Sequence, residues 1–275
     1  MTKTNHKEPK VNELYAKLKE GVQKVYFSDK WKEILLFQSR FHNYSFNNMM
    51  LIYFQCPTAT FVAGYTDWQK LGRQVQYKQE GIKILAPSYK IEKDEQTGEK
   101  KKKLVGFHQT SVFDVSQTKG APLPSLTHEL TMETATLRDF YETLKAVCPF
   151  PVEEKTITNG SKGYFDHLTQ SIAVKKGMAA LHKCKTLVHE MAHGYLHTNS
   201  DKSKEMKEVE AEGTAFVVLS YFGFDTSNYS FPYVAGWNGS AFADHIQKAG
   251  DTIQKTAEKL IAEIEKEMSK KSAAA

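Results

Sequence analysis

The chain has 275 residues, of which 40% are hydrophobic, 25% charged and 12% aromatic, a composition that excludes a mainly disordered or fibrous protein. This length suits two domains or one large one, and either can bury a full core. The three cysteines are an odd number without C-x-x-C spacing, so we expect free thiols. No stretch approaches the roughly 18 apolar residues of a membrane span, and the first residues show no targeting pattern, so we expect a cytoplasmic protein without a membrane partner.

The net charge of +5 is unevenly distributed along the chain. Residues 1–124 carry 20 Lys and Arg against 12 Asp and Glu, a net charge of +8, whereas residues 125–275 carry a net charge of −3. Four of these cations form the run Lys100 to Lys103, which we assign to a solvated loop. The asymmetry favours two modules, with a polyanion as a candidate partner of the first.

Apolar residues at helical spacing predict four helices in the first half, followed by the alternating pattern of strands. The expected helices cover residues 11–26, 28–42, 45–55 and 66–71. Two antiparallel strands are expected at 81–87 and 104–115, with a long charged loop at 92–103 between them. Residues 116–133 contain two prolines and form the predicted linker.

The second half is predicted to start with a helix at 134–147, followed by three short strands at 152–157, 163–167 and 171–175. Further helices are expected at 178–197, 202–221 and 241–268. We therefore expect an α+β protein with two domains. Residues 1–125 would form helices with a small antiparallel sheet, and residues 130–275 would form a short sheet packed on helices.

The strongest chemical signal is the sequence His189-Glu190-Met191-Ala192-His193, in the middle of the helix expected at 178–197. Residues four apart on a helix point the same way, so His189 and His193 can both face one metal ion. This is the zincin pattern, in which zinc or another divalent metal activates a water molecule. Glu190 is the catalytic candidate that accepts the proton as the water attacks a carbonyl.

A third metal ligand has to come from another element, and the next helix offers several glutamates. Glu208 and Glu212 are four apart and share a face with two alanines, whose small side chains allow close approach to the first helix. We expect Glu208 to bind the metal and Glu212 to accept the spare N–H of a metal-binding histidine. Glu210 lies on the opposite side of this helix, and we expect it to face solvent.

His197, one turn beyond His193, is a rival third ligand. One straight helix rarely wraps three consecutive turns around an ion, so we interpret His197 as a packing or pocket-lining residue. A fourth protein ligand at this position would instead indicate a structural metal.

Aromatic, amide and cationic side chains alternate in the first half, the combination with which proteins bind single-stranded nucleic acid. Aromatic residues at helical spacing are also typical of a core, so this pattern alone leaves both interpretations open. The candidate DNA-binding residues are Arg40, Tyr44, Asn47, Asn48, Trp68, Arg73, Lys78 and Lys83.

Three stretches of the first half, FHNYSFNNMMLI, TATFVAGYTDWQKLGRQV and GIKILAP, resemble the N-terminal single-stranded-DNA-binding domain of ArdC-type antirestriction proteins. In the second half, HEMAH and EVEAEGTAF resemble the zincin-like metallopeptidase domain that follows it in those proteins and is related to ImmA/IrrE metallopeptidases. The resemblance implies DNA binding by the first domain. It also implies a metal site of His189, His193 and Glu208, with Glu190 as general base.

The resemblance further implies a protein of a mobile genetic element with an antirestriction or DNA-protecting role during conjugation. Its expected partners are single-stranded DNA and a protein or peptide substrate. Two alternatives stay open. One is an ImmA-like protease that cleaves a repressor, and the other is a non-enzymatic DNA-binding protein with a structural metal.

Overall fold

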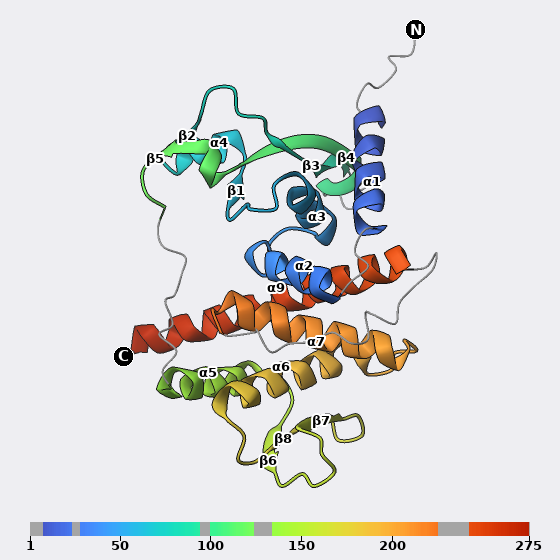
Figure 1. Cartoon of the computed structure of the whole chain (residues 1–275), viewed down its shortest axis with the longest axis vertical. Helices are drawn as coiled ribbons and strands as arrows, with labels where there is room; N and C mark the ends of the chain where they lie inside the picture. The colour runs from blue at the N-terminus through green and yellow to red at the C-terminus, as the bar shows by residue number, and fades with distance from the viewer. Residues whose placement is uncertain (1–7, 24–27, 94–99, 124–133, 225–241, 275) are drawn as a thin grey trace. The chain divides into compact units, whose positions relative to one another are not determined.

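The structure is a computed structural model that describes residues 8–23, 28–93, 100–123, 134–224 and 242–274. Helices and small sheets confirm the α+β class (Figure 1). The chain divides into two compact units, Met1–Lys24 with Asn47–Pro124 and Val25–Phe46 with Ser125–Ala275. The domains proposed at 1–125 and 130–275 stay a prediction, and the second unit of the structure also takes in residues 25–46.

An antiparallel hairpin forms the centre of the first unit. Strand β3 (Ile82–Lys93) pairs with β4 (Lys100–Asp114), and β1 (Val62–Ala63) pairs with the other edge of β4. The prediction of a loop at 92–103 is wrong at both ends, because β3 continues to Lys93 and β4 starts at Lys100, which pairs with it. Opposite charges on the two strands contribute to this pairing, since Lys103 Nζ lies 3.3 Å from Glu92 Oε2. The centre of the loop, 94–99, lies outside the described residues.

Three helices and a two-stranded sheet complete the first unit. Helix α1 (Glu8–Gln23) contacts β3 and β4, and α3 (Phe46–Gln55) and α4 (Tyr65–Lys70) follow. Strand β2 (Arg73–Val75) pairs with β5 (Thr118–Gly120), which follows the 3₁₀ turn η1 (Val115–Gln117). The linker expected at 116–133 is therefore wrong at its start. The Asp114 carboxylate accepts hydrogen bonds from the backbone amides of Thr60 and Ser116, which folds this segment back onto the unit.

The second unit places helix α6 (Ala180–His197) between a small sheet and further helices (Figure 1). In the sheet, β6 (Val152–Lys155) is parallel to β8 (Ser171–Lys175), and β7 (Gly163–Asp166) is antiparallel to it. Helices α5 (Thr134–Val147) and α7 (Lys204–Tyr221) also pack on α6. Helices α2 (Ser28–Arg40) and α9 (Phe242–Ala274) cover α7. The three strands and the HExxH helix expected here are confirmed.

Helix α6 lies close to its neighbours because small residues face it and occur within it. A Cβ atom at Gly194 would overlap the rings of Phe150 and Phe165, so only glycine allows this approach to β7. On the other side, Ala211 and Ala215 of α7 are fully buried, as the sequence predicts. The backbone of α6 is thus held on two sides, which fixes the direction of its histidines.

Helix α7 is buried on nearly every side, since α6 covers one face and α2 and α9 cover the others. Two amide hydrogen bonds join α2 and its C-terminal turn to α9: Gln38 Nε2 donates to the carbonyl of Gly250 at 3.1 Å, and Gln254 Nε2 donates to that of Phe41 at 3.0 Å. Polar groups on a helix enclosed in this way need partners inside the protein, because a buried polar group without a hydrogen bond is costly.

Cys56, Cys148 and Cys184 are free, as expected. Among the described helices, none has both the length and the apolar composition that crossing a membrane requires.

Candidate metal centre and nucleic-acid interface

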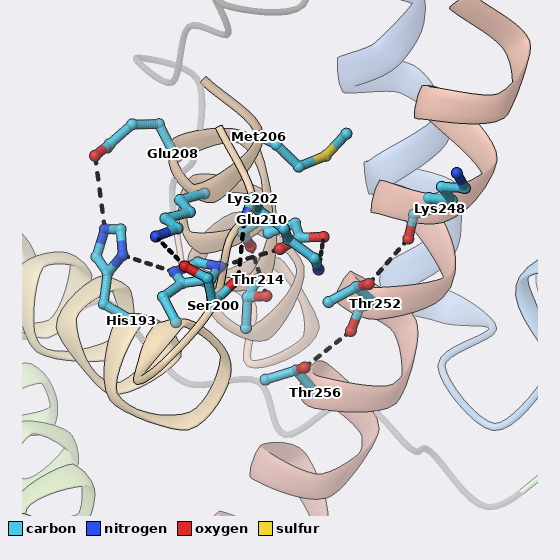
Figure 2. Close-up of polar contacts among 12 residues, drawn as sticks. His193, Ser200, Lys202, Met206, Glu208, Glu210, Thr214, Lys248, Thr252 and Thr256 are labelled. Atoms are coloured by element: carbon cyan, nitrogen blue, oxygen red, sulfur yellow. Dashed lines mark hydrogen bonds and ion pairs between the residues drawn. The ribbon is translucent and has the colours of Figure 1, made fainter. Parts of the chain in front are cut away.

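Helices α6 and α7 bring three potential metal ligands together. His189 and His193 lie one turn apart on α6, with their Nε2 atoms 3.0 Å apart. Glu208 of α7 reaches both, with a carboxylate oxygen 3.6 Å from His189 Nε2. Its other carboxylate oxygen lies 3.8 Å from His193 Nε2, the contact that Figure 2 shows. A tetrahedral zinc ion with bonds of about 2.0–2.1 Å separates its ligands by about 3.3–3.4 Å. The spacing and the nitrogen and oxygen donors therefore fit a divalent metal ion.

The protonation states of the cluster also suit a cation. Burial acts to lower the pKa of His189, but its hydrogen bonds to Glu208 and Glu212 outweigh this effect and raise the pKa to about 9. Burial and the neighbouring charge of His189 lower the pKa of His193 to about 3, so His193 is neutral. The hydrogen bond to His189 lowers the pKa of Glu208, which is therefore ionised. A metal ion would replace the proton that His189 shares with the carboxylates.

Glu190 lies on α6 next to the cluster and beside β7. Its side chain is buried, and it contacts the backbone of Phe165. Burial raises the pKa of the Glu190 carboxyl to about 7, against the opposing effect of His189. A carboxyl group with a pKa near neutrality can both take up and release a proton at physiological pH.

Two more glutamates of α7 lie behind the ligands. Glu212 Oε2 is 3.1 Å from His189 Nδ1, and Glu212 Oε1 is 2.5 Å from Lys185 Nζ. Glu210 is fully buried, so the expectation that it faces solvent is wrong. A position two residues from Glu208 does point to the other side of the helix, but His197 and Lys202 cover that side of α7. The apolar run at 215–219 was the available signal, because such a run is typical of a helix enclosed by protein.

His197 is buried and contacts the back of His193. Its Nδ1 atom lies 2.8 Å from His193 Nδ1, and its Nε2 atom lies 3.0 Å from Glu210 Oε2. Both ring nitrogens are thus engaged away from Glu208 and His189. Within the described part of the chain, the cluster holds three potential ligands and no fourth.

The eight candidate DNA-binding residues are not all part of the same unit. Arg40 and Tyr44 belong to the second unit, and the other six, Asn47 among them, belong to the first. Trp68 is fully buried, and its indole N–H donates to the carbonyl of Phe113 at 2.9 Å. Its indole ring is therefore part of the core of the first unit.

Three other candidates make hydrogen bonds within the first unit. Asn48 donates to the carbonyl of Leu85 at 2.8 Å and accepts from the amide of Leu85 at 2.9 Å. The Arg73 guanidinium donates to the side chain and the carbonyl of Thr118 on β5. Lys83 Nζ donates to a serine hydroxyl of β4 at 2.9 Å. These groups hold the fold together, and their contact with DNA stays a prediction.

Lys78 instead lines a groove of the first unit, to which α4, β2, β4 and β5 contribute residues. Figure 1 shows where these elements lie in the unit. This cavity has a volume of about 720 Å³, and the rings of Tyr65, Tyr77 and Phe113 and the ammonium groups of Lys78 and Lys119 line it. We call it the aromatic groove. Tyr77 is 88% exposed, and Lys78 Nζ lies 5.3 Å from the centre of its ring. Sequence reasoning missed Phe113 and Lys119, because they come from strands far along the chain from Tyr77.

Two families match successive parts of the chain. Residues 4–113 match the N-terminal domain of the anti-restriction factor ArdC, and residues 152–234 match the IrrE N-terminal-like domain of peptidase M78. The chain is an ArdC-type protein. The two matched domains follow each other in the order that the sequence resemblance implies.

The fold of this ArdC-type chain is similar to crystal structures of the antirestriction ArdC protein from plasmid R388. The metal-free structure has a TM-score of 0.53 and 21% identity, and the match covers 81% of this chain and 86% of that one. The Mn(II)-bound structure has a TM-score of 0.52 and 19% identity, covering 80% and 89%. An uncharacterized Bacillus anthracis protein, pXO2-81, is 24% identical over 98% of this chain, which spans 54% of that relative's length.

We predict that Asn48→Ala lowers the free energy of unfolding by about 1–3 kcal/mol, because the buried amide and carbonyl of Leu85 lose their partners. Urea denaturation measures this change. Gln69→Ala, at an exposed position of α4, serves as the control and should shift stability by less than about 0.5 kcal/mol. Unchanged stability of Asn48→Ala would contradict this structural role.

Proposed function

We propose that this ArdC-type protein binds single-stranded DNA with its first unit and hydrolyses peptide bonds at a zinc centre in its second. In this proposal it protects DNA against restriction during conjugation. The observation that carries the enzymatic part is the cluster of His189, His193 and Glu208 with Glu190 beside it. The R388 ArdC protein has a Mn(II)-bound form, which supports a divalent metal in this protein, and we propose that zinc binds at the cluster.

His189 and His193 would hold the zinc through Nε2, and Glu208 through its carboxylate. A bound zinc ion supplies a Lewis acid and lowers the pKa of a water molecule toward neutrality. With a metal ion in place of the shared proton, Glu212 would accept a hydrogen bond from Nδ1 of His189, which would leave the Nε2 lone pair of this histidine directed at the ion.

Three protein ligands are typical of catalytic zinc sites, whereas structural sites have four. Both ring nitrogens of His197 contact other groups, which argues against its service as a fourth ligand. This arrangement favours an enzyme over a protein with a purely structural metal. An ImmA-like repressor protease differs from the proposal in its substrate and in the role of the first unit.

Glu190 is proposed to carry the proton transfers. Its carboxylate accepts a proton from the attacking water as the water oxygen bonds to the peptide carbonyl carbon. It then delivers this proton to the amide nitrogen as the C–N bond breaks. The burial that brings the pKa of Glu190 to about 7 makes both the uptake and the release of this proton accessible near neutral pH.

The aromatic groove is the proposed site for single-stranded DNA. Exposed rings of Tyr65 and Tyr77 can stack on bases, and this stacking does not require a particular base sequence. The ammonium groups of Lys78 and Lys119 can contact phosphate oxygens. Of the residues proposed from the sequence alone, Lys78 is the one that lines this groove.

We predict that Glu190→Gln keeps its zinc but loses at least about 100-fold in peptide hydrolysis, because the amide cannot accept the proton. Inductively coupled plasma mass spectrometry measures the zinc content, and peptide libraries measure cleavage. Glu205→Gln, which changes an exposed glutamate of α7, serves as the control. Hydrolysis equal to wild type in Glu190→Gln would refute the general base, and stoichiometric zinc in His189→Ala would refute the site.

We predict that Tyr77→Ala weakens binding of a labelled single-stranded oligonucleotide by about 5- to 100-fold, through the loss of a stacking ring. Lys119→Gln should reduce the dependence of log affinity on log salt by nearly one unit. Fluorescence anisotropy over a range of salt concentrations measures both changes. Tyr164→Ala removes an exposed ring in the second unit and serves as the control. An equal loss of affinity in this control would exclude the groove as the specific site.

A further inference from the structure

A chain of hydrogen-bonded side chains, buried at its middle, leads from the metal cluster to the segment between α6 and α7. His193 Nδ1 lies 2.8 Å from His197 Nδ1, and His197 Nε2 lies 3.0 Å from Glu210 Oε2. Glu210 Oε1 in turn lies 2.6 Å from Lys202 Nζ (Figure 2). The side chains of His197 and Glu210 are 1% and 0% exposed. Water is therefore excluded from the middle of this chain.

The proton positions in this chain follow from its two ends. Glu210 pairs with the ammonium group of Lys202, and an ionised carboxylate can only accept hydrogen bonds. His197 therefore carries its hydrogen on Nε2. A metal ion can bind His193 at Nε2 only when the ring hydrogen of His193 is on Nδ1, and His197 Nδ1, 2.8 Å away, is then the acceptor of that hydrogen. A hydrogen on Nδ1 leaves His193 with a bare Nε2, the atom that faces His189 and Glu208.

We propose that Glu210, acting through His197, is a positioning residue that sets the tautomer and ring orientation of His193 for metal binding. This inference rests on the metal centre of the proposed function. Glu212 contacts the other histidine directly, with 3.1 Å between its carboxylate and His189 Nδ1. The two histidines are thus oriented by carboxylates of the same helix, one directly and one through an intervening imidazole.

Stability alone does not account for a buried chain of this kind. Removing charged groups from water is expensive, and replacing a buried ion pair with apolar residues is often neutral or stabilising. The chain instead ends on the nitrogen of His193 that determines whether its other nitrogen can bind a metal. Partners of this kind change metal affinity by about 10- to 100-fold when they are removed.

The test compares Glu210→Gln with wild type in the 275-residue chain, first metal-free and then with added zinc. The amide can donate as well as accept, so it no longer imposes one tautomer on His197. Long-range ¹⁵N–¹H correlation spectra report the tautomers of His193 and His197. Competition with a chromophoric chelator reports zinc affinity. We expect a single Nδ1–H tautomer of His193 in wild type, mixed tautomers in Glu210→Gln, and zinc affinity reduced by about 10- to 100-fold.

Glu154→Gln is the matched control, because Glu154 forms an ion pair of 2.7 Å with Lys183, away from the cluster. It should leave the tautomer of His193 and the zinc affinity unchanged. Wild-type tautomers and affinity in Glu210→Gln, or an equal loss of affinity in Glu154→Gln, would overturn the proposal.

The wild-type protein alone also tests the inference, whether or not Glu210→Gln folds. An Nε2–H tautomer of His193 in the metal-free protein would overturn the positioning role while leaving the metal centre in place. Failure of the wild-type protein to bind zinc would overturn the metal centre and, with it, the positioning role.

Discussion

One turn of α6 sets the distance between His189 and His193, and the candidate site depends on holding that turn in place. Their Nε2 atoms are 3.0 Å apart, and Glu208 approaches from a separate helix. Rotating α6 by one residue would turn these side chains through about 100° and separate them from Glu208. Close packing on two sides of α6 prevents such a rotation. Gly194 packs against the rings of Phe150 and Phe165 on one side, and the buried Ala211 and Ala215 of α7 lie on the other. The packing of small residues therefore determines the geometry of the ligands.

The second constraint is the burial of α7. This helix carries Glu208, Glu210 and Glu212 within five positions, and each of them lies in a different environment. Glu208 contacts both histidines of the cluster, Glu212 contacts His189 and Lys185, and Glu210 contacts His197 and Lys202. Every one of these carboxylates faces a nitrogen that can donate a hydrogen bond, as burial of a charge requires. The partner of each carboxylate is therefore determined by how α7 packs against the rest of the unit.

The sequence was sufficient to predict the features that depend on the spacing of residues near one another in the chain. The period of the helices, the three strands of the second unit and the approach of Glu208 to the HExxH helix all follow from residues close together in the chain. The burial of Glu210 was missed, because a helical wheel gives directions but cannot show that His197 and Lys202 cover this one. For the same reason Trp68, Asn48 and Arg73 looked like a DNA-binding surface. Their aromatic, amide and cationic groups pack against strands that lie far away in the sequence.

Anomalous diffraction at the zinc absorption edge, from crystals of the zinc-loaded protein, tests the central claim most directly. The account predicts one strong peak bounded by Nε2 of His189, Nε2 of His193 and the carboxylate of Glu208, with a water molecule as the remaining ligand. A peak elsewhere in the second unit, or a fourth protein ligand such as His197 at this peak, would contradict it.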